Sequence, residues 1–126
     1  MKSLLSTLVL LCLLTLPTVA QELEEELRFK PGASSTQIKR GIARGESMRF
    51  LVGARGGQKM NVVVQSLEQN AVFEVLGDGG PLGTSQESAG KQKWSGTLPG
   101  YGNGTYAIIV SSTRGGSEFN LYVEIR

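Results

Sequence analysis

The sequence predicts an all-β fold, a single antiparallel β-sandwich, and three observations support this prediction. Short runs of residues alternate between apolar and polar side chains at period two along most of the chain. All 17 glycines lie after residue 31 and separate these runs at intervals of about ten residues, as in small sandwiches and barrels. No helical period appears after residue 20. Most runs have one apolar and one mixed face, so we expect two packed sheets of seven or eight strands, with a small closed β-barrel as the alternative.

The first twenty residues have the pattern of a secretory signal peptide. Lys2 precedes an apolar run over residues 4–16, and small residues at Thr18 and Ala20 suit cleavage before Gln21. This run is shorter than the roughly 20 residues that span a bilayer, so we expect no membrane span in the mature form. The only cysteine, Cys12, lies within residues 1–20. We therefore expect a periplasmic or secreted protein without a disulfide.

Residues 21–27 form an acidic leader with four glutamates, which we expect to be a turn or two of helix or a mobile segment. The sandwich domain is predicted over residues 28–126. Beyond residue 26 the chain has 12 basic against 7 acidic residues, once Lys2 and the four leader glutamates are removed from the totals. This mildly basic domain favours an acidic partner. Its scattered charges do not indicate nucleic-acid binding.

Seven strands follow from the alternation, and glycine or proline punctuates most of the boundaries between them. The expected strands are residues 36–42, 46–55, 59–67, 71–76, 93–98, 106–111 and 119–126. The last strand carries apolar side chains at every second position from Phe119 to Ile125. A hairpin turn is expected at Gly56-Gly57. We expect residues 77–83 to be a loop because of their glycine and proline content, and residues 85–91 to be polar and exposed.

The composition excludes most enzyme designs. A chain without histidine has no Ser-His-Asp or Cys-His nucleophile, no histidine base and no histidine metal ligand. Asp78 is the only aspartate, and one carboxylate is too few for a calcium site. Ser88 and Lys91 have the Ser-x-x-Lys spacing, but that geometry needs a helix and this stretch has no helical pattern. We therefore expect no enzyme activity, no metal and no cofactor.

Two loop side chains are candidates for contact with a partner. Tyr101 lies in a stretch of glycine, proline and asparagine where no strand register would bury it. It either projects as a contact residue or folds back over its own loop. Arg114 precedes two glycines in the turn before the last strand, so it either reaches a partner or is a solvated turn residue. The sequence does not say whether the two lie at the same end of the sandwich.

A resemblance to a known family rests on several motifs taken together. The run from Trp94 reads W-x-G-x-L-P, the run from Gly104 reads G-x-Y-x-I-x-V, and the strand from Phe119 to Ile125 follows. These motifs, with Ala54 to Val62, resemble the bacterial pre-peptidase C-terminal type of β-sandwich. When residues 38–60 and 73–76 are added, residues 28–126 resemble more narrowly the bacterial inhibitors of goose-type lysozyme. Inhibitors of invertebrate-type lysozyme share much of the pattern.

This resemblance implies a periplasmic protein that pushes loops into a lysozyme cleft, where an arginine pairs with a catalytic carboxylate. Arg114 matches that arginine, and a guanidinium suits the task because it binds a carboxylate at two points. In the turn before the second strand the resemblance implies an aromatic contact, but this chain has Gly45-Glu46-Ser47. Glu46, Ser47 and Tyr101 are therefore the further predicted contact residues. The alternative is an envelope module that binds a polysaccharide or another protein and inhibits nothing.

Overall fold

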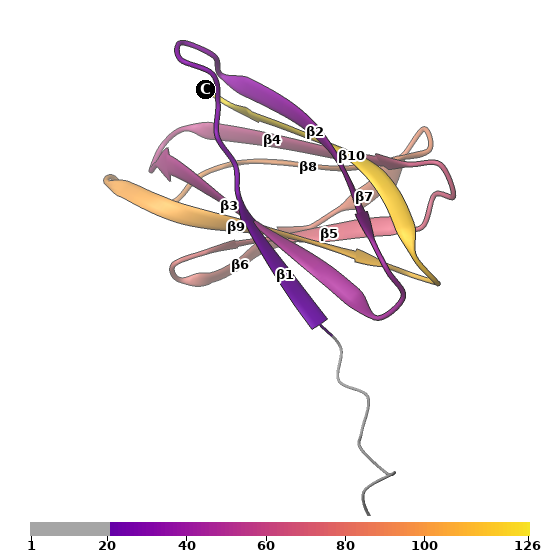
Figure 1. Ribbon diagram of the computed structural model, residues 1–126. Coiled ribbons are helices and arrows are strands. Elements are labelled where there is room, and N and C mark those ends of the chain that lie inside the picture. Colours follow the sequence, from indigo (N-terminus) through magenta and orange to yellow (C-terminus); the bar gives the residue numbers. More distant parts are fainter. Residues whose placement is uncertain (1–20) are drawn as a thin grey trace, which may run out of the picture.

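The computed structural model describes residues 21–126 as two five-stranded sheets packed face to face (Figure 1). The first sheet has the order β1 (Gln21–Glu26), β3 (Glu46–Arg55), β9 (Asn103–Ser112), β5 (Ala71–Gly77) and β6 (Gly80–Thr84). The second has the order β2 (Ser35–Ile42), β10 (Ser117–Ile125), β4 (Lys59–Ser66), β8 (Lys91–Thr97) and β7 (Gln86–Ser88). The sandwich is confirmed and the closed-barrel alternative is wrong. The predicted signal peptide, with Cys12, lies outside the described residues.

The sandwich has ten strands where seven or eight were expected, and β1, β6 and β7 account for the difference. We expected a loop over residues 77–83, but β6 begins at Gly80 and pairs with β5 across an irregularity at Val75/Leu76. The polar stretch expected to be merely exposed contains β7, which pairs with β8. Both strands are short edge strands held by main-chain pairing, which leaves little trace in an apolar pattern.

β1 departs from the expected helical turn or mobile leader, because it is a strand that pairs with β3 in parallel. Glutamate and leucine favour helix in isolation, but the open edge of β3 offers main-chain partners and arginines. Arg49 Nε lies 3.0 Å from Glu22 Oε1, and Arg40 Nε of β2 lies 2.9 Å from Glu25 Oε1. Leu27, which follows β1, is buried and donates a backbone hydrogen bond to Leu51.

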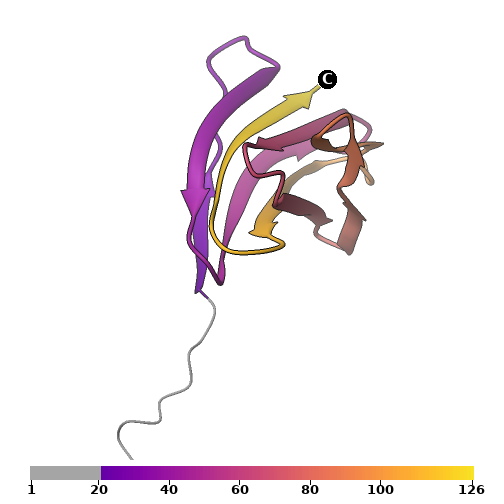
Figure 2. The same ribbon diagram turned by 90° about the vertical axis from the view of Figure 1, so that its right-hand side faces the viewer.

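The core fills the space between the sheets and comes from the alternating apolar positions that the sequence shows. Phe50 of β3 and Phe119 of β10 meet across it edge to face, with ring centroids 6.1 Å apart. All four apolar side chains of β10 from Phe119 to Ile125 are buried, as the period-two pattern predicts. In Figure 2 the two layers curve around this core, with β1 and β2 together at one edge.

Trp94 closes the opposite edge of the sandwich and explains the glycines of its motif. Its indole packs against the core from β8. A Cβ added to Gly83 of β6 would lie 2.3 Å from the indole Nε1, and one added to Gly96 would lie 2.9 Å from the ring. The glycine two residues after Trp94 is therefore there because a side chain on that face would collide with the ring.

Within residues 21–126 there is no helix of the length and apolar character that a membrane crossing requires. The same residues contain no group of three or more potential metal-ligating side chains.

Candidate functional site

Three loops meet at one end of the sandwich and bring Arg114 together with Glu46 and Ser47. Ser117 pairs with Ile42, and Ser47 pairs with Ser111, which places the β2–β3 turn beside the β9–β10 loop. The β4–β5 loop joins them through Asn70. We call this group of loops, residues 43–45, 67–70 and 113–116, the Arg114 end. It lies on the right in Figure 1.

Asn70 holds the β9–β10 loop in place. It is 2% exposed, and its Nδ2 donates to the carbonyl oxygens of Arg114 at 2.9 Å and Gly116 at 2.8 Å. Its Oδ1 accepts from Ser117 Oγ at 2.8 Å, and its own carbonyl accepts from the backbone N–H of Thr113. The loop that carries Arg114 is therefore held in one conformation by a buried amide.

The Arg114 side chain is exposed and only partly engaged. One of its five donors, on Nη2, binds the carbonyl oxygen of Glu68 at 2.8 Å. Among residues 21–126 it takes part in no salt bridge. The guanidinium is thus oriented by the β4–β5 loop, while its charge stays available to a carboxylate from outside.

Glu46 and Ser47, at the start of β3, adjoin the Arg114 end, but the Glu46 carboxylate is already hydrogen-bonded within its own turn. Its Oε1 accepts from the backbone N–H of Ala43 at 2.6 Å, and its N–H donates back to the Ala43 carbonyl. Gly45 takes the positive φ of +81° that this turn needs. Ser47 is half-buried on β3 between β1 and β9. The contact roles of both residues stay predictions.

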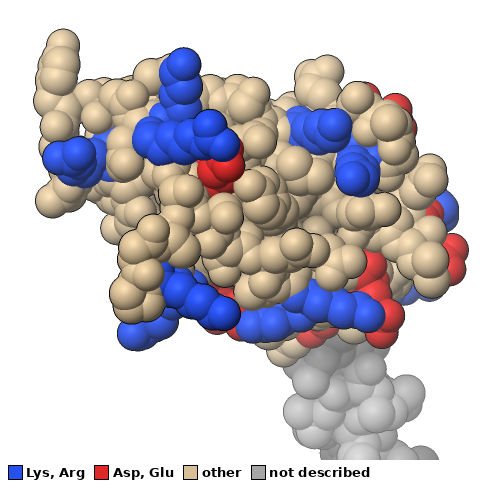
Figure 3. Space-filling view, turned by 90° about the horizontal axis from the view of Figure 1, so that it is seen from above, with Lys and Arg blue, Asp and Glu red and all other residues tan. Residues whose placement is uncertain are grey.

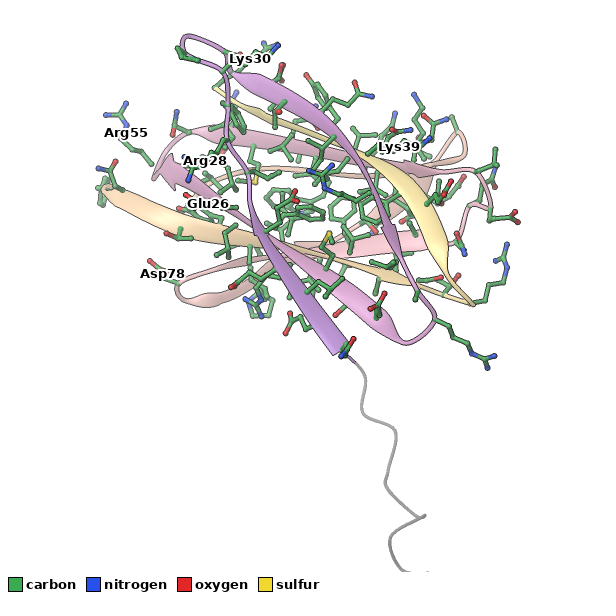
Figure 4. The ribbon with its side chains drawn as sticks, in the orientation of Figure 1. Glu26, Arg28, Lys30, Lys39, Arg55 and Asp78 are labelled. Carbon is green, nitrogen blue, oxygen red and sulfur yellow. The ribbon has the colours of Figure 1, made fainter. Side chains whose placement is uncertain are left out.

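Tyr101 lies at the opposite end of the molecule from Arg114. Its loop is bound to the β3–β4 turn, where the N–H of Gly56 donates to Gly102 and that of Gly57 donates to Leu98. Figure 4 labels Arg55 and Asp78 at this end. β9, ten residues long, separates the two ends by about 30 Å. Tyr101 is fully exposed and does not fold back over its loop, and the structure does not bring it together with Arg114.

Sequence reasoning missed two exposed side chains at the Arg114 end. Arg44 is exposed at the tip of the β2–β3 turn, one residue before Gly45. Leu67 begins the β4–β5 loop and is 92% exposed, which is unusual for a large apolar side chain. Arg44 could have been found from its place beside a turn glycine. Leu67 could not, because the sequence extends the preceding strand through it.

No protein-family model matches the chain, and no curated protein matches it either. Its structure is similar to the crystal structure of PliG from Aeromonas hydrophila, a periplasmic inhibitor of g-type lysozyme. The TM-score is 0.73 at 25% sequence identity, over 84% of this chain and 98% of that chain.

Two further solved structures share the fold. PliG from Salmonella Typhimurium, also a periplasmic inhibitor of g-type lysozyme, gives a TM-score of 0.61 at 20% identity, over 82% of this chain and 98% of that chain. The pre-peptidase C-terminal domain of a Bacillus anthracis collagenase gives a TM-score of 0.61 at 10% identity, over 86% of this chain and 99% of that chain. The predicted resemblance to goose-type lysozyme inhibitors, within the pre-peptidase C-terminal type of sandwich, is therefore confirmed at the level of structure.

Proposed function

We propose that this protein is a periplasmic binding protein that inhibits a goose-type lysozyme by placing the Arg114 end in the active-site cleft. The observation that carries the proposal is the match to the Aeromonas hydrophila inhibitor over nearly its whole length. The proposal is supported by the absence of histidine, which removes the commonest catalytic bases, and by the single aspartate. It assigns the chain a binding role and no reaction.

Arg114 is the central contact in this proposal. Glycoside hydrolases of most families work with a pair of carboxyl groups, and a guanidinium that enters such a site can pair with an ionised one. Arg114 has free donors, no salt bridge within the described part of the chain, and a backbone fixed by Asn70. Arg44 adds a second positive charge at the same end. Tyr101 cannot share a cleft with Arg114, because β9 separates them.

The test measures lysozyme activity on cell-wall substrate with increasing amounts of residues 21–126. We expect inhibition at micromolar protein or below. Arg114→Ala is expected to weaken it at least about thirtyfold, equivalent to about 2 kcal/mol, because a lysozyme carboxylate then stays desolvated and unpaired. Arg114→Lys is expected to retain only part of the inhibition, since an ammonium group cannot bind a carboxylate at two points as a guanidinium does.

The matched control is Arg55→Ala, which removes an exposed arginine at the other end and is expected to leave inhibition unchanged. Full lysozyme activity at micromolar excess of the parent protein would show that the proposed function is wrong. Inhibition that survives Arg114→Ala but is lost in Arg55→Ala or Tyr101→Ala would move the contact to the opposite end.

A further inference from the structure

The outer face of the second sheet carries a row of polar side chains around one tyrosine. In the register of this sheet Tyr122 of β10 lies between Gln37 of β2 and Val63 of β4. On the same face, Asn61 and Gln65 of β4 lie to either side of Val63, and on β10 Tyr122 lies between Asn120 and Glu124. An amide donates and accepts hydrogen bonds at once, so these side chains suit a ligand whose groups do the same, such as a sugar hydroxyl.

The ring of Tyr122 lies along β10, because its hydroxyl reaches the next outward side chain on the same strand. Tyr122 Oη donates to Glu124 Oε2 at 3.1 Å, and Arg126 Nη2 donates to that same oxygen at 2.9 Å. These bonds hold the hydroxyl in place, and the half-buried ring lies on the outer face of the sheet. An aromatic face held in this way stacks against the C–H groups of a pyranose ring.

Two shallow hollows continue this surface in both directions along β10 and β4. The hollow near the Arg114 end is lined by Lys39, Gln65, Glu118 and Asn120, among others. The one near the C-terminus is lined by Lys59, Asn61, Ser95 and Arg126, among others. From Lys59 to Gln65 the track measures about 20 Å, with Tyr122 between the hollows. Its shape is that of a shallow, extended site for a linear chain.

The charge on this face is positive. Lys39, Lys59, Lys91 and Lys93 are exposed and lie on outward positions of β2, β4 and β8. None of these four lysines forms a salt bridge within residues 21–126. The acids at outward positions of β10 are Glu118 and Glu124, and Glu124 is already bound to Arg126. Figure 3 shows this face, with Lys and Arg around a mostly uncharged centre, and Figure 4 labels Lys39 on it.

We propose that this outer face of the second sheet binds a linear polysaccharide that carries carboxylate groups. Tyr122 stacks on a sugar ring, the flanking amides bind hydroxyl groups, and the four lysines attract the carboxylates. A protein partner is disfavoured because the centre of a protein interface is more apolar than this row of amides. The inference goes beyond the proposed lysozyme inhibition and uses a different surface.

The experiment titrates residues 21–126 with oligogalacturonate, a linear carboxylated chain, by calorimetry at two salt concentrations. The matched ligand is the same oligomer with its carboxylates methyl-esterified. We expect binding of the acidic form, weakened by added salt, and binding of the ester at least about tenfold weaker. Tyr122→Ala is expected to weaken binding about fivefold to tenfold. Lys39→Gln and Lys93→Gln are each expected to weaken it a few-fold.

Tyr101→Ala is the control and is expected to change nothing, because Tyr101 is an exposed tyrosine at an end of the sandwich. If Tyr122→Ala does not fold, Tyr122→Phe, which keeps the ring, and Asn120→Ala, which removes an exposed amide, are compared instead. The proposal is overturned if oligogalacturonate does not bind at millimolar concentration. It is also overturned if Tyr122→Ala binds oligogalacturonate as well as the parent protein does. Where Asn120→Ala replaces that variant, unchanged binding by Asn120→Ala overturns it in the same way. Equally strong binding of duplex DNA would overturn it too. Lysozyme inhibition by the same variants is measured in parallel, so that failure of one proposal is distinguished from failure of the other.

Discussion

Asn70 is the residue on which the geometry of the Arg114 end depends. Its side chain makes three hydrogen bonds to the β9–β10 loop and to the start of β10. Asn70→Ala removes the donor to the Gly116 carbonyl oxygen and the acceptor of the Ser117 hydroxyl, and it leaves the Arg114 carbonyl oxygen with Ser112 Oγ as its donor. We expect it to lower the free energy of unfolding by about 2–3 kcal/mol, measured by urea denaturation.

A second readout separates a positioning role from a merely structural one. If Asn70 positions Arg114, the folded Asn70→Ala protein inhibits lysozyme less well at concentrations where unfolding is negligible. Asn103→Ala, at an exposed position at the opposite end, is expected to change neither stability nor inhibition. Full inhibition by folded Asn70→Ala would show that the loop does not need this anchor.

Glu124 stabilises the folded protein by an amount that depends on pH. The hydrogen bond from Arg126, with a smaller one from Tyr122, holds the pKa of the Glu124 carboxyl below its ordinary value of 4.5, against a partial burial that raises it. Because this pKa is lower in the folded state, the folded protein binds fewer protons than the unfolded chain. The stabilisation is therefore complete above about pH 4.5 and is lost as the pH falls through the lowered pKa.

Glu124→Gln is expected to be less stable than the parent at pH 7, with a difference that shrinks as the pH is lowered toward 3. Urea unfolding of the two proteins at pH 7 and at pH 3 measures this difference in stability. Glu118→Gln, at an exposed position on the same strand, is the control and is expected to show no such dependence. A difference that is equal at both pH values would contradict the assignment.

At the scale of single elements, β6 depends on its contact with Trp94. It shares few register positions with β5, and an irregularity interrupts them, so its place in the sheet rests partly on the close approach of Gly83 to the indole. Gly83→Ala puts a methyl group where the ring lies. We expect a loss of about 1–3 kcal/mol in the free energy of unfolding.

The effect of Gly83→Ala on this contact can be measured by fluorescence, because Trp94 is the only tryptophan in the sequence. The emission of the folded variant is expected to shift toward that of a more solvated indole. Gly53→Ala is the control, since a Cβ there meets nothing within 4 Å and its φ is not positive. Equal stability of the two variants would mean that the ring moves aside at no cost.

Across the whole molecule, the sequence predicted the long strands, whose alternate side chains are buried in the core. It missed the short strands that form only because a neighbouring sheet edge is available. The long strands show themselves because alternate side chains enter the core, as in β10. Few apolar side chains are buried by β1, β6 and β7. Whether these segments form strands therefore depends on the position of a neighbouring sheet edge. The same limit applies to the candidate site. Arg114 was found from its turn, whereas the burial of Asn70 and the separation of Arg114 from Tyr101 needed the register of both sheets.

The two open edges of the sandwich are closed by different means, and this leads to a prediction about β1. Trp94 of β8 covers the edge at β6 and β7 by apolar contact with the core and with Gly83. The edge at β1 and β2 is closed by the salt bridge from Arg40 to Glu25, by pairing of β1 with β3, and by Leu27. A partly exposed salt bridge such as this one contributes about 1 kcal/mol or less, so we expect the main-chain pairing of β1 to contribute most of the stabilisation at this edge.

A chain that begins at Leu27 keeps the core but exposes the backbone of β3 along an edge that also carries Leu51. We expect it to unfold with a free energy lower by about 1–3 kcal/mol than residues 21–126, and to self-associate through the bare edge. Denaturation and size-exclusion chromatography measure the two effects. The matched control keeps β1 and carries Glu22→Gln and Glu25→Gln, which remove the salt bridges to Arg49 and Arg40 and leave the strand pairing. If this control is as unstable and as associated as the truncated chain, the charges rather than the strand hold the edge closed.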